Sequence, residues 1–120
     1  MISNTTRTDF NTTLDNVIVS LKPSDPYKIV LFGSYANGNP TEHSDIDLMV
    51  ILDNEHVSQT YQERLDKKVY IRTLLLEINQ EYPLDLLVYS KAELQKIKEY
   101  GNPFIIEVEK TGKIIYEKIN

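Results

Sequence analysis

The chain has 120 residues, a formal net charge of −5 at pH 7 and no cysteine. Its length suits one hydrophobic core, so we expect a single domain over residues 1–120. The lack of cysteine excludes disulfides, thiol nucleophiles and thiolate metal sites. There is no apolar run of roughly 18 residues, as a membrane span needs, and no secretory signal pattern. We therefore expect a cytoplasmic protein that does not bind membranes.

The charge distribution argues against direct nucleic-acid binding. The arginines are Arg7, Arg64 and Arg72, and the lysines form no cluster along the chain. A protein that holds nucleic acid unaided usually presents a basic face that neutralises several phosphates. A small phosphorylated ligand that arrives with its own cations remains compatible with this composition.

The first half of the chain predicts one helix and two strands. Residues 9–21 carry apolar side chains at helical spacing, and the two prolines of KPSDP end that helix. Residues 27–32 (YKIVLF) form a short apolar run that predicts a buried strand. The following GSYANGNPTEHS predicts a tight turn and a loop, and residues 45–52 (DIDLMVIL) predict a second strand.

The second half predicts more helix. Apolar residues at helical intervals predict one long helix over residues 60–80, with a solvated charged face made of Glu63, Asp66, Lys67, Lys68 and Arg72. Residues 84–90 (LDLLVYS) predict a third strand. Ser90 and Glu93 form the S-x-x-E pattern of a capping box, which opens a helix over residues 91–100.

The C-terminal part predicts one more helix and a last short strand. Asn102 and Pro103 suit the cap and first position of a helix, Gly112 suits its end, and residues 113–118 predict a strand. Strands and helices interleave, but the first two strands are joined by a loop alone. We therefore expect an α+β fold, a small mixed β-sheet with helices packed on one face.

Two acids stand one residue apart at the head of the second strand. Because side chains alternate along a strand, Asp45 and Asp47 project from the same face, roughly 6–7 Å apart at the backbone. Two carboxylates this close repel each other, and a divalent cation between them removes the conflict. Mg²⁺ needs only one or two carboxylates and completes its shell with waters and phosphates. The pair predicts a site for a Mg²⁺–nucleotide complex.

A third acid and a glycine-serine turn extend this candidate site. Asp85 begins the third predicted strand, and if that strand lies beside the second, a carboxylate triad results. Such a triad can hold two metal ions about 3.5–4 Å apart. Gly33 directly follows the first strand and permits a sharp turn, and the hydroxyl of Ser34 with nearby free amides can bind phosphate oxygens.

The spacing of these residues is similar to a known signature. Gly33-Ser34, ten residues and then Asp45-x-Asp47 resembles the GSx10DxD signature of the nucleotidyltransferases of the DNA polymerase beta superfamily. The longer text FGSYANGNPTEHSDIDLMV resembles their FGSxARGxxxxxSDIDLxV line. The chain length and Asp85 make the protein look like the minimal nucleotidyltransferases, single-domain proteins often found as antitoxins of HEPN-type RNase toxins. The resemblance covers residues 27–90 well.

The resemblance implies a polymerase beta-like fold and a reaction. Mg²⁺, as two ions, would be bound by Asp45, Asp47 and Asp85, and Asp85 would also activate the acceptor hydroxyl. Gly33 and Ser34 would bind the phosphates of a nucleoside triphosphate, with ATP the expected donor. In-line attack on the α-phosphate would transfer AMP and release pyrophosphate. The implied acceptor is a tyrosine of a partner HEPN toxin, which makes the protein an antitoxin; a small-molecule acceptor such as an aminoglycoside fits this short chain less well.

One residue departs from the family pattern. Asn37 stands where the family usually has the arginine of "ARG", in the predicted nucleotide-binding turn. Asparagine brings no charge, so triphosphate affinity or turnover is expected to be lower. The sequence offers Lys28, Lys67, Lys68 and Arg72 as substitute cations without choosing among them. The alternative function is therefore an inactive antitoxin that neutralises its partner by contact, and a homo- or hetero-oligomer is compatible with either function.

Three further residues near the motif have competing interpretations. Tyr35 is the best candidate to stack a nucleobase, although packing is the commoner role of a tyrosine in this position. His43 lies in the loop before the acids, where a histidine without a function is the favoured interpretation over a phosphate contact. Ser44 is expected to shape that loop rather than to react.

Overall fold

The structure is a computed structural model that describes residues 8–119. The elements follow in the order α1 (Phe10–Leu21), η1 (Lys22–Ser24), β1 (Pro26–Phe32), α2 (Gly33–Asn37), β2 (Ile46–Leu52), α3 (Tyr61–Leu74), α4 (Leu76–Glu81), β3 (Leu84–Ser90), α5 (Lys91–Glu99), α6 (Pro103–Thr111) and β4 (Lys113–Glu117). The predicted strands therefore form within one or two residues of their expected bounds.

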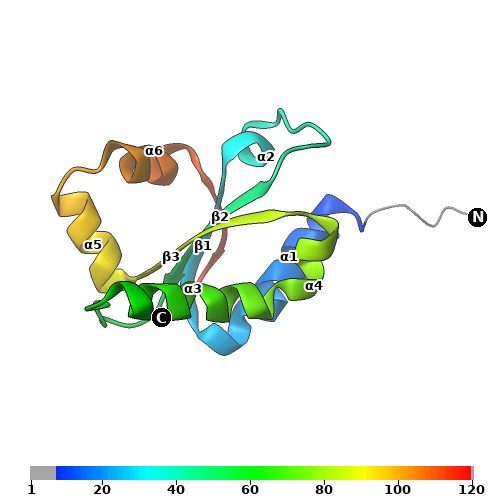
Figure 1. Ribbon diagram of the computed structural model, residues 1–120. Coiled ribbons are helices and arrows are strands. Elements are labelled where there is room, and N and C mark those ends of the chain that lie inside the picture. Colours follow the sequence, from blue (N-terminus) through cyan, green and yellow to red (C-terminus); the bar gives the residue numbers. More distant parts are fainter. Residues whose placement is uncertain (1–7, 120) are drawn as a thin grey trace, which may run out of the picture.

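The strands of residues 8–119 form one mixed sheet in the order β3-β2-β1-β4 (Figure 1). β1 pairs antiparallel with β2 and β4, whereas β2 and β3 run parallel. The parallel pair requires a crossover, which α3 and α4 supply, while the loop after α2 is enough to join the antiparallel pair. The predicted α+β class with a small mixed sheet is confirmed.

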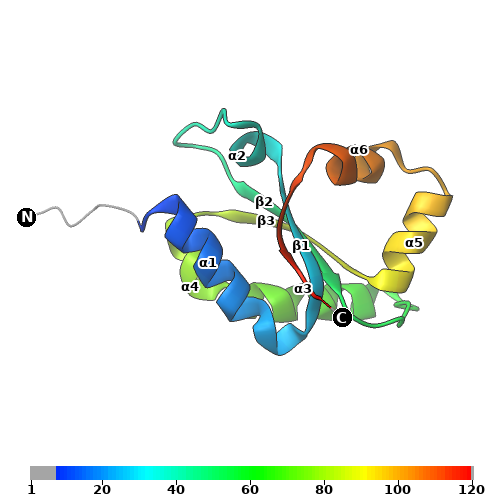
Figure 2. The same cartoon turned by 180° about the vertical axis from the view of Figure 1, so that it is seen from behind.

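The helices lie on both faces of this sheet, which corrects the expectation of a single covered face. Helices α1, α3 and α4 lie on one side, and α5 and α6 lie on the other (Figures 1 and 2). The physical reason is visible in β2, where every residue from Leu48 to Leu52 is buried. A strand whose two faces are both apolar needs cover on both sides.

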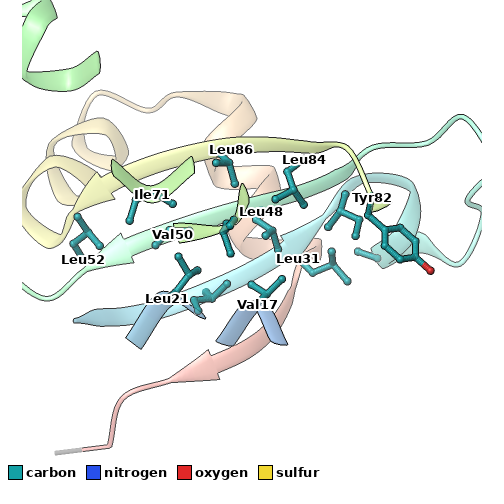
Figure 3. Close-up of a cluster of buried hydrophobic side chains, with 14 residues drawn as sticks. Val17, Leu21, Leu31, Leu48, Val50, Leu52, Ile71, Tyr82, Leu84 and Leu86 are labelled. Atoms are coloured by element: carbon teal, nitrogen blue, oxygen red, sulfur yellow. The ribbon is translucent and has the colours of Figure 1, made fainter. Parts of the chain in front are cut away.

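The larger core lies beneath the side of the sheet that α1, α3 and α4 cover (Figure 3). Its buried members are Val17, Leu21, Ile29, Leu31, Ala36, Ile46, Leu48, Val50, Leu52, Ile71, Leu75, Tyr82, Leu84 and Leu86. The smaller core joins α5 and α6 to the opposite face through Val30, Met49, Ile51, Leu94, Ile105 and Val108. Alternate residues of β1 and β2 thus serve different cores.

The predicted long helix over residues 60–80 is two helices. Leu75, with φ −104° and ψ 15°, leaves helical geometry and separates α3 from α4. Ile71 and Leu75 are fully buried, whereas Val69 is 50% and Leu76 55% exposed. The apolar residues that predicted the helix, Tyr61, Leu65, Val69 and Leu76, therefore form an exposed stripe. The sheet is instead contacted by the face that carries Ile71 and Leu75.

The predicted caps of α5 and α6 are confirmed. The Ser90 hydroxyl accepts from the Glu93 amide and the Glu93 carboxylate accepts from the Ser90 amide, which completes the capping box of α5. The Asn102 side chain caps α6, with Pro103 at its first position and Gly112 after its last turn. Among residues 8–119, no helix is long and apolar enough to cross a bilayer.

Candidate active site

The sheet brings the three predicted acids to one end of β2 and β3. Asp45 immediately precedes β2, Asp47 is its second residue, and Asp85 is the second residue of β3. Asp47 and Asp85 are direct partners in the parallel register, so both side chains project from the same face. The prediction for Asp85 required its strand to lie beside the second strand, and the structure meets this requirement.

The electrostatics of Asp47 reflect this crowding. Burial raises the pKa of the Asp47 carboxyl above its ordinary value, and the neighbouring charges of Asp85 and Asp45 raise that pKa further. Asp47 is partly buried, whereas Asp45 and Asp85 are exposed. Negative charge is thus concentrated where β2 and β3 begin, an arrangement that favours a cationic ligand.

Gly33 lies directly against the Asp47 carboxylate. The glycine has φ +75°, a left-handed conformation that few other residues adopt. A Cβ atom built on Gly33 would lie 2.0 Å from Asp47 Oδ2. The carboxylate therefore occupies the space that any side chain at position 33 would need, so the turn after β1 and the acid on β2 require each other.

The short helix α2 follows this glycine and contains the other predicted nucleotide-binding residues. Ser34 is partly buried, and its carbonyl accepts hydrogen bonds from the amides of Gly38 and Asn39, the latter at 3.0 Å. Gly38 closes the turn with φ +79°. Asn37 is exposed at the end of α2, so it lies in the turn that the family pattern assigns to an arginine.

The loop from α2 to β2 contains His43 and Ser44, two of the three residues with competing interpretations. Ser44 Oγ accepts a hydrogen bond of 2.8 Å from the Thr41 amide, and the Ser44 amide donates to the Thr41 carbonyl at 3.1 Å. Ser44 therefore shapes the loop, as expected. His43 has an 87% exposed side chain that lies 3.5 Å from a Glu42 carboxylate oxygen.

Tyr35 is partly buried and packs against the larger core. Its ring stacks on Phe10 with centroids 4.6 Å apart and meets Tyr82 edge-on at 6.3 Å. Both partners belong to or pack against the larger core. The interpretation of Tyr35 as a packing residue is confirmed, and this side chain is already engaged in the folded protein.

Two of the four substitute cations, Lys28 and Lys67, lie away from the glycine-serine turn. Lys28 is opposite Ile51 in β2, four residues along the strand from Asp47, and its Nζ lies 3.9 Å from a Glu117 carboxylate oxygen. Lys67 forms an ion pair with Glu93, the capping residue after the far end of β3. The remaining two, Lys68 and Arg72, are on α3, which packs on the opposite face from the acids.

An aromatic pair stands beside the acids, and sequence reasoning did not single it out. Phe32 is the direct cross-strand partner of Asp47, and its ring meets that of Phe104 edge-on with centroids 5.9 Å apart. Phe32 was accessible to sequence reasoning as the residue before the glycine-serine turn. Phe104 gave no such signal, because its position depends on how α6 packs.

The donor atoms at this site suit a hard divalent cation. Carboxylate oxygens are the ligands that Mg²⁺ prefers, and burial together with the charges of Asp85 and Asp45 raises the pKa of the Asp47 carboxyl. Within residues 8–119, no three His, Asp or Glu side chains converge closely enough to chelate an ion as they stand. The chemistry of the donor set therefore fits the metal, with water and ligand oxygens needed to complete its shell.

Comparison with known proteins identifies the family. The family model described as a nucleotidyltransferase domain matches residues 14–116. The chain belongs to this nucleotidyltransferase family. The match contains Gly33, Ser34 and all three acids, so the candidate site lies inside the shared domain.

Two curated relatives of this nucleotidyltransferase come from Methanocaldococcus jannaschii. "Putative protein adenylyltransferase MJ1305" is 31% identical over 113 residues, which cover 92% of this chain and 74% of the relative. "Putative protein adenylyltransferase MJ1379" is 46% identical over 54 residues, which cover 42% of this chain and 53% of the relative. The chain thus spans about half the length of the second relative.

Solved structures share the nucleotidyltransferase fold. A chain in the crystal structure of a toxin–antitoxin with AMP-PNP matches with a TM-score of 0.56 and 20% identity, over 88% of this chain and 73% of that chain. A "putative nucleotidyltransferase" from Sulfolobus solfataricus matches with a TM-score of 0.57 and 15% identity, over 90% and 83%. The predicted nucleotidyltransferase fold is confirmed.

Proposed function

We propose that this nucleotidyltransferase transfers AMP from ATP to a hydroxyl group of a partner protein and depends on Mg²⁺. The observation that carries the proposal is the position of Asp47, which lies beside Asp85, interacts with the charge of Asp45 and contacts the backbone of Gly33. Carboxylates and a close-approach glycine are thereby combined at one end of the sheet, as a metal-bound triphosphate requires.

Each residue has a stated role in the proposed reaction. Asp45, Asp47 and Asp85 would hold two Mg²⁺ ions, which when bound supply charge neutralisation of the phosphates. Gly33 and Ser34 would bind phosphate oxygens through backbone amides and the serine hydroxyl. Asp85 would accept the proton of the acceptor hydroxyl as that oxygen bonds to the α-phosphorus. The bond from the α-phosphorus to the bridging oxygen breaks, and pyrophosphate leaves.

The partner is proposed from the comparisons. One relative bears the name of a protein adenylyltransferase, and one structural neighbour comes from a toxin–antitoxin with AMP-PNP. These support a protein acceptor, and we propose a tyrosine of a HEPN-type toxin that this chain neutralises as its antitoxin. Positioning and charge stabilisation would supply most of the rate enhancement, as in other phosphoryl-group transfers.

Nucleotide binding tests the proposed site. ATP is titrated into the purified protein by calorimetry, with and without Mg²⁺. We expect Mg²⁺-dependent binding that disappears in Asp45→Asn/Asp47→Asn and persists in the control Asp15→Asn, which changes an exposed acid on α1. Wild-type protein that binds none of ATP, GTP, CTP and UTP would contradict the proposal.

A second candidate function is neutralisation of the toxin by contact alone. It is favoured by the neutral, exposed Asn37 and by the placement of Lys28 and Lys67 away from the turn. Co-expression with a HEPN-type toxin separates the two. Transfer predicts that Asp45→Asn/Asp47→Asn loses protection while still forming the complex, whereas contact predicts full protection.

A further inference from the structure

Phe104 occupies the flank of α6 that faces the acids. Helix α6 buries Ile105 and Val108 against the sheet. On one flank, Glu109 Oε1 lies 2.9 Å from Lys98 Nζ of α5, so that flank faces the neighbouring helix. At 100° per residue, Phe104 lies on the opposite flank. Its ring meets Phe32 edge-on, with centroids 5.9 Å apart and an interplanar angle of 79°.

Phe32 connects this ring to the carboxylates. Phe32 and Asp47 are direct partners across β1 and β2. Opposed residues of an antiparallel pair project from the same face, with Cβ atoms about 4.5–5.5 Å apart. The side chains of Phe32 and Asp47 therefore leave the sheet side by side on one face, and Phe104 contacts the Phe32 ring on that face.

Phe104 is exposed to solvent at a position close to the acids, where a ligand could contact it. Phe104 as a residue is 54% exposed, while its ring contacts Phe32. Exposed apolar residues are common, and Ile106 of the same helix is 45% exposed. Phe104 differs from Ile106 because it has an aromatic support and lies beside a charged site. Base stacking requires this combination of a held ring and a free face.

We propose that Phe104, positioned by Phe32, stacks on the base of the nucleotide whose phosphates bind at Gly33, Ser34 and the acids. This inference rests on the proposed function. The triphosphate extends from the carboxylates, and the base, which follows the sugar, reaches the aromatic pair. Stacking uses the π-face that every base has, so it tolerates different bases. Purines, with the larger face, bind more tightly than pyrimidines.

Calorimetry with two probes tests the role of Phe104. ATP carries a base, and inorganic tripolyphosphate carries the same chain of phosphates without one; both are titrated in Mg²⁺. We expect Phe104→Ala to weaken ATP binding by about 30-fold, the middle of the range for one stacked base. Tripolyphosphate binding stays unchanged. Phe104→Tyr keeps an aromatic face and binds ATP like the wild type, and Ile106→Ala is the matched control on the same helix.

The outcomes separate this inference from the proposed function. If Phe104→Ala binds ATP like the wild type, or loses ATP and tripolyphosphate equally, the stacking role is overturned and the phosphate site stands. If the wild type binds neither probe, both the proposed function and the stacking role fail. Thermal unfolding of each variant establishes that the protein is folded, and the half-exposed position of Phe104 makes a large loss of stability unexpected.

Discussion

At the scale of single residues, Gly33 and Asp47 constrain each other. The carboxylate fills the space of a missing side chain, and the glycine adopts a positive φ that β-carbons disfavour. A residue at position 33 that adopted the same positive φ but carried a Cβ atom would collide with Asp47 and displace its carboxylate. The absence of a Cβ atom at position 33 therefore permits both the left-handed backbone of Gly33 and the proposed metal-binding position of Asp47.

We expect Gly33→Ala to lower the free energy of unfolding by about 1–3 kcal/mol and to abolish Mg²⁺–ATP binding. The new Cβ meets Asp47 Oδ2, and the backbone is strained as well. Gly38→Ala is the matched control, since Gly38 also has a positive φ but its Cβ would meet nothing within 4 Å. Urea denaturation and calorimetry measure the two effects, and equal loss of ATP binding in both variants would contradict the role of the contact.

The charge on Asp47 is expected to destabilise the metal-free protein. Because burial and the two neighbouring acids raise its folded pKa above the ordinary 3.8, its contribution to stability is fully present below that value and is lost as pH rises through the raised pKa. Asp47→Asn should therefore increase the unfolding free energy at neutral pH by roughly 0.2–1 kcal/mol, the range for opposed cross-strand pairs.

Urea denaturation without divalent metal tests this sign. The gain from Asp47→Asn should shrink as pH falls below 3.8, where the wild-type carboxyl is protonated. Asp15→Asn, on an exposed acid of α1, supplies the control for the general effect of removing a charge. A variant that is less stable than wild type at neutral pH would show that Asp47 makes stabilising contacts in the metal-free state.

At the scale of elements, Glu93 at the start of α5 forms an ion pair with Lys67 of α3 and accepts a hydrogen bond from Ser58 in the loop before α3. Burial opposes ionisation of Glu93, but hydrogen bonds from Lys67 and from the backbone amides of Ser90 and Ser58 outweigh it and lower its pKa to about 2. Lys67 was expected on a solvated face, yet its side chain is 16% exposed and paired with this acid. A cap and a tertiary ion pair thus share one carboxylate.

Glu93→Gln is expected to cost about 3 kcal/mol of unfolding free energy at neutral pH, because it leaves the Lys67 charge partly buried without its partner. The stabilisation by Glu93 is present above its ordinary pKa of 4.5 and is lost as pH falls toward about 2. The difference between variant and wild type should therefore narrow in acid. Urea denaturation across that window measures it, with the exposed Glu99→Gln of the same helix as control; a pH-independent difference would exclude the ionic contribution.

At the scale of the whole molecule, one strand serves two cores. Leu48 and Val50 of β2 belong to the core under α1, α3 and α4, while Met49 and Ile51 belong to the core under α5 and α6. We propose that residues 8–119 unfold as one domain, since neither core can lose β2 without exposing the other.

Shortening one buried side chain on each face of β2 tests whether the two cores unfold together. Leu48→Ala and Met49→Ala should each cost about 2–5 kcal/mol, because both side chains are fully buried. Each variant should keep a single transition in which circular dichroism and tyrosine fluorescence coincide. A Met49→Ala protein that loses the α5–α6 side in a separate, earlier transition would show that the smaller core is an independent unit.

The sequence by itself determined the strands, the caps of α5 and α6, and the acids and glycine-serine turn of the candidate site, because these depend on local patterns. Alternation marks strands, S-x-x-E marks a cap, and the spacing from Gly33 to Asp47 marks the family. The tertiary structure alone decided which faces meet. It placed α5 and α6 on the second face, turned the apolar stripe of α3 outward and set Phe104 beside Phe32. Periodicity shows that a helix has an apolar face, but only packing shows what covers that face.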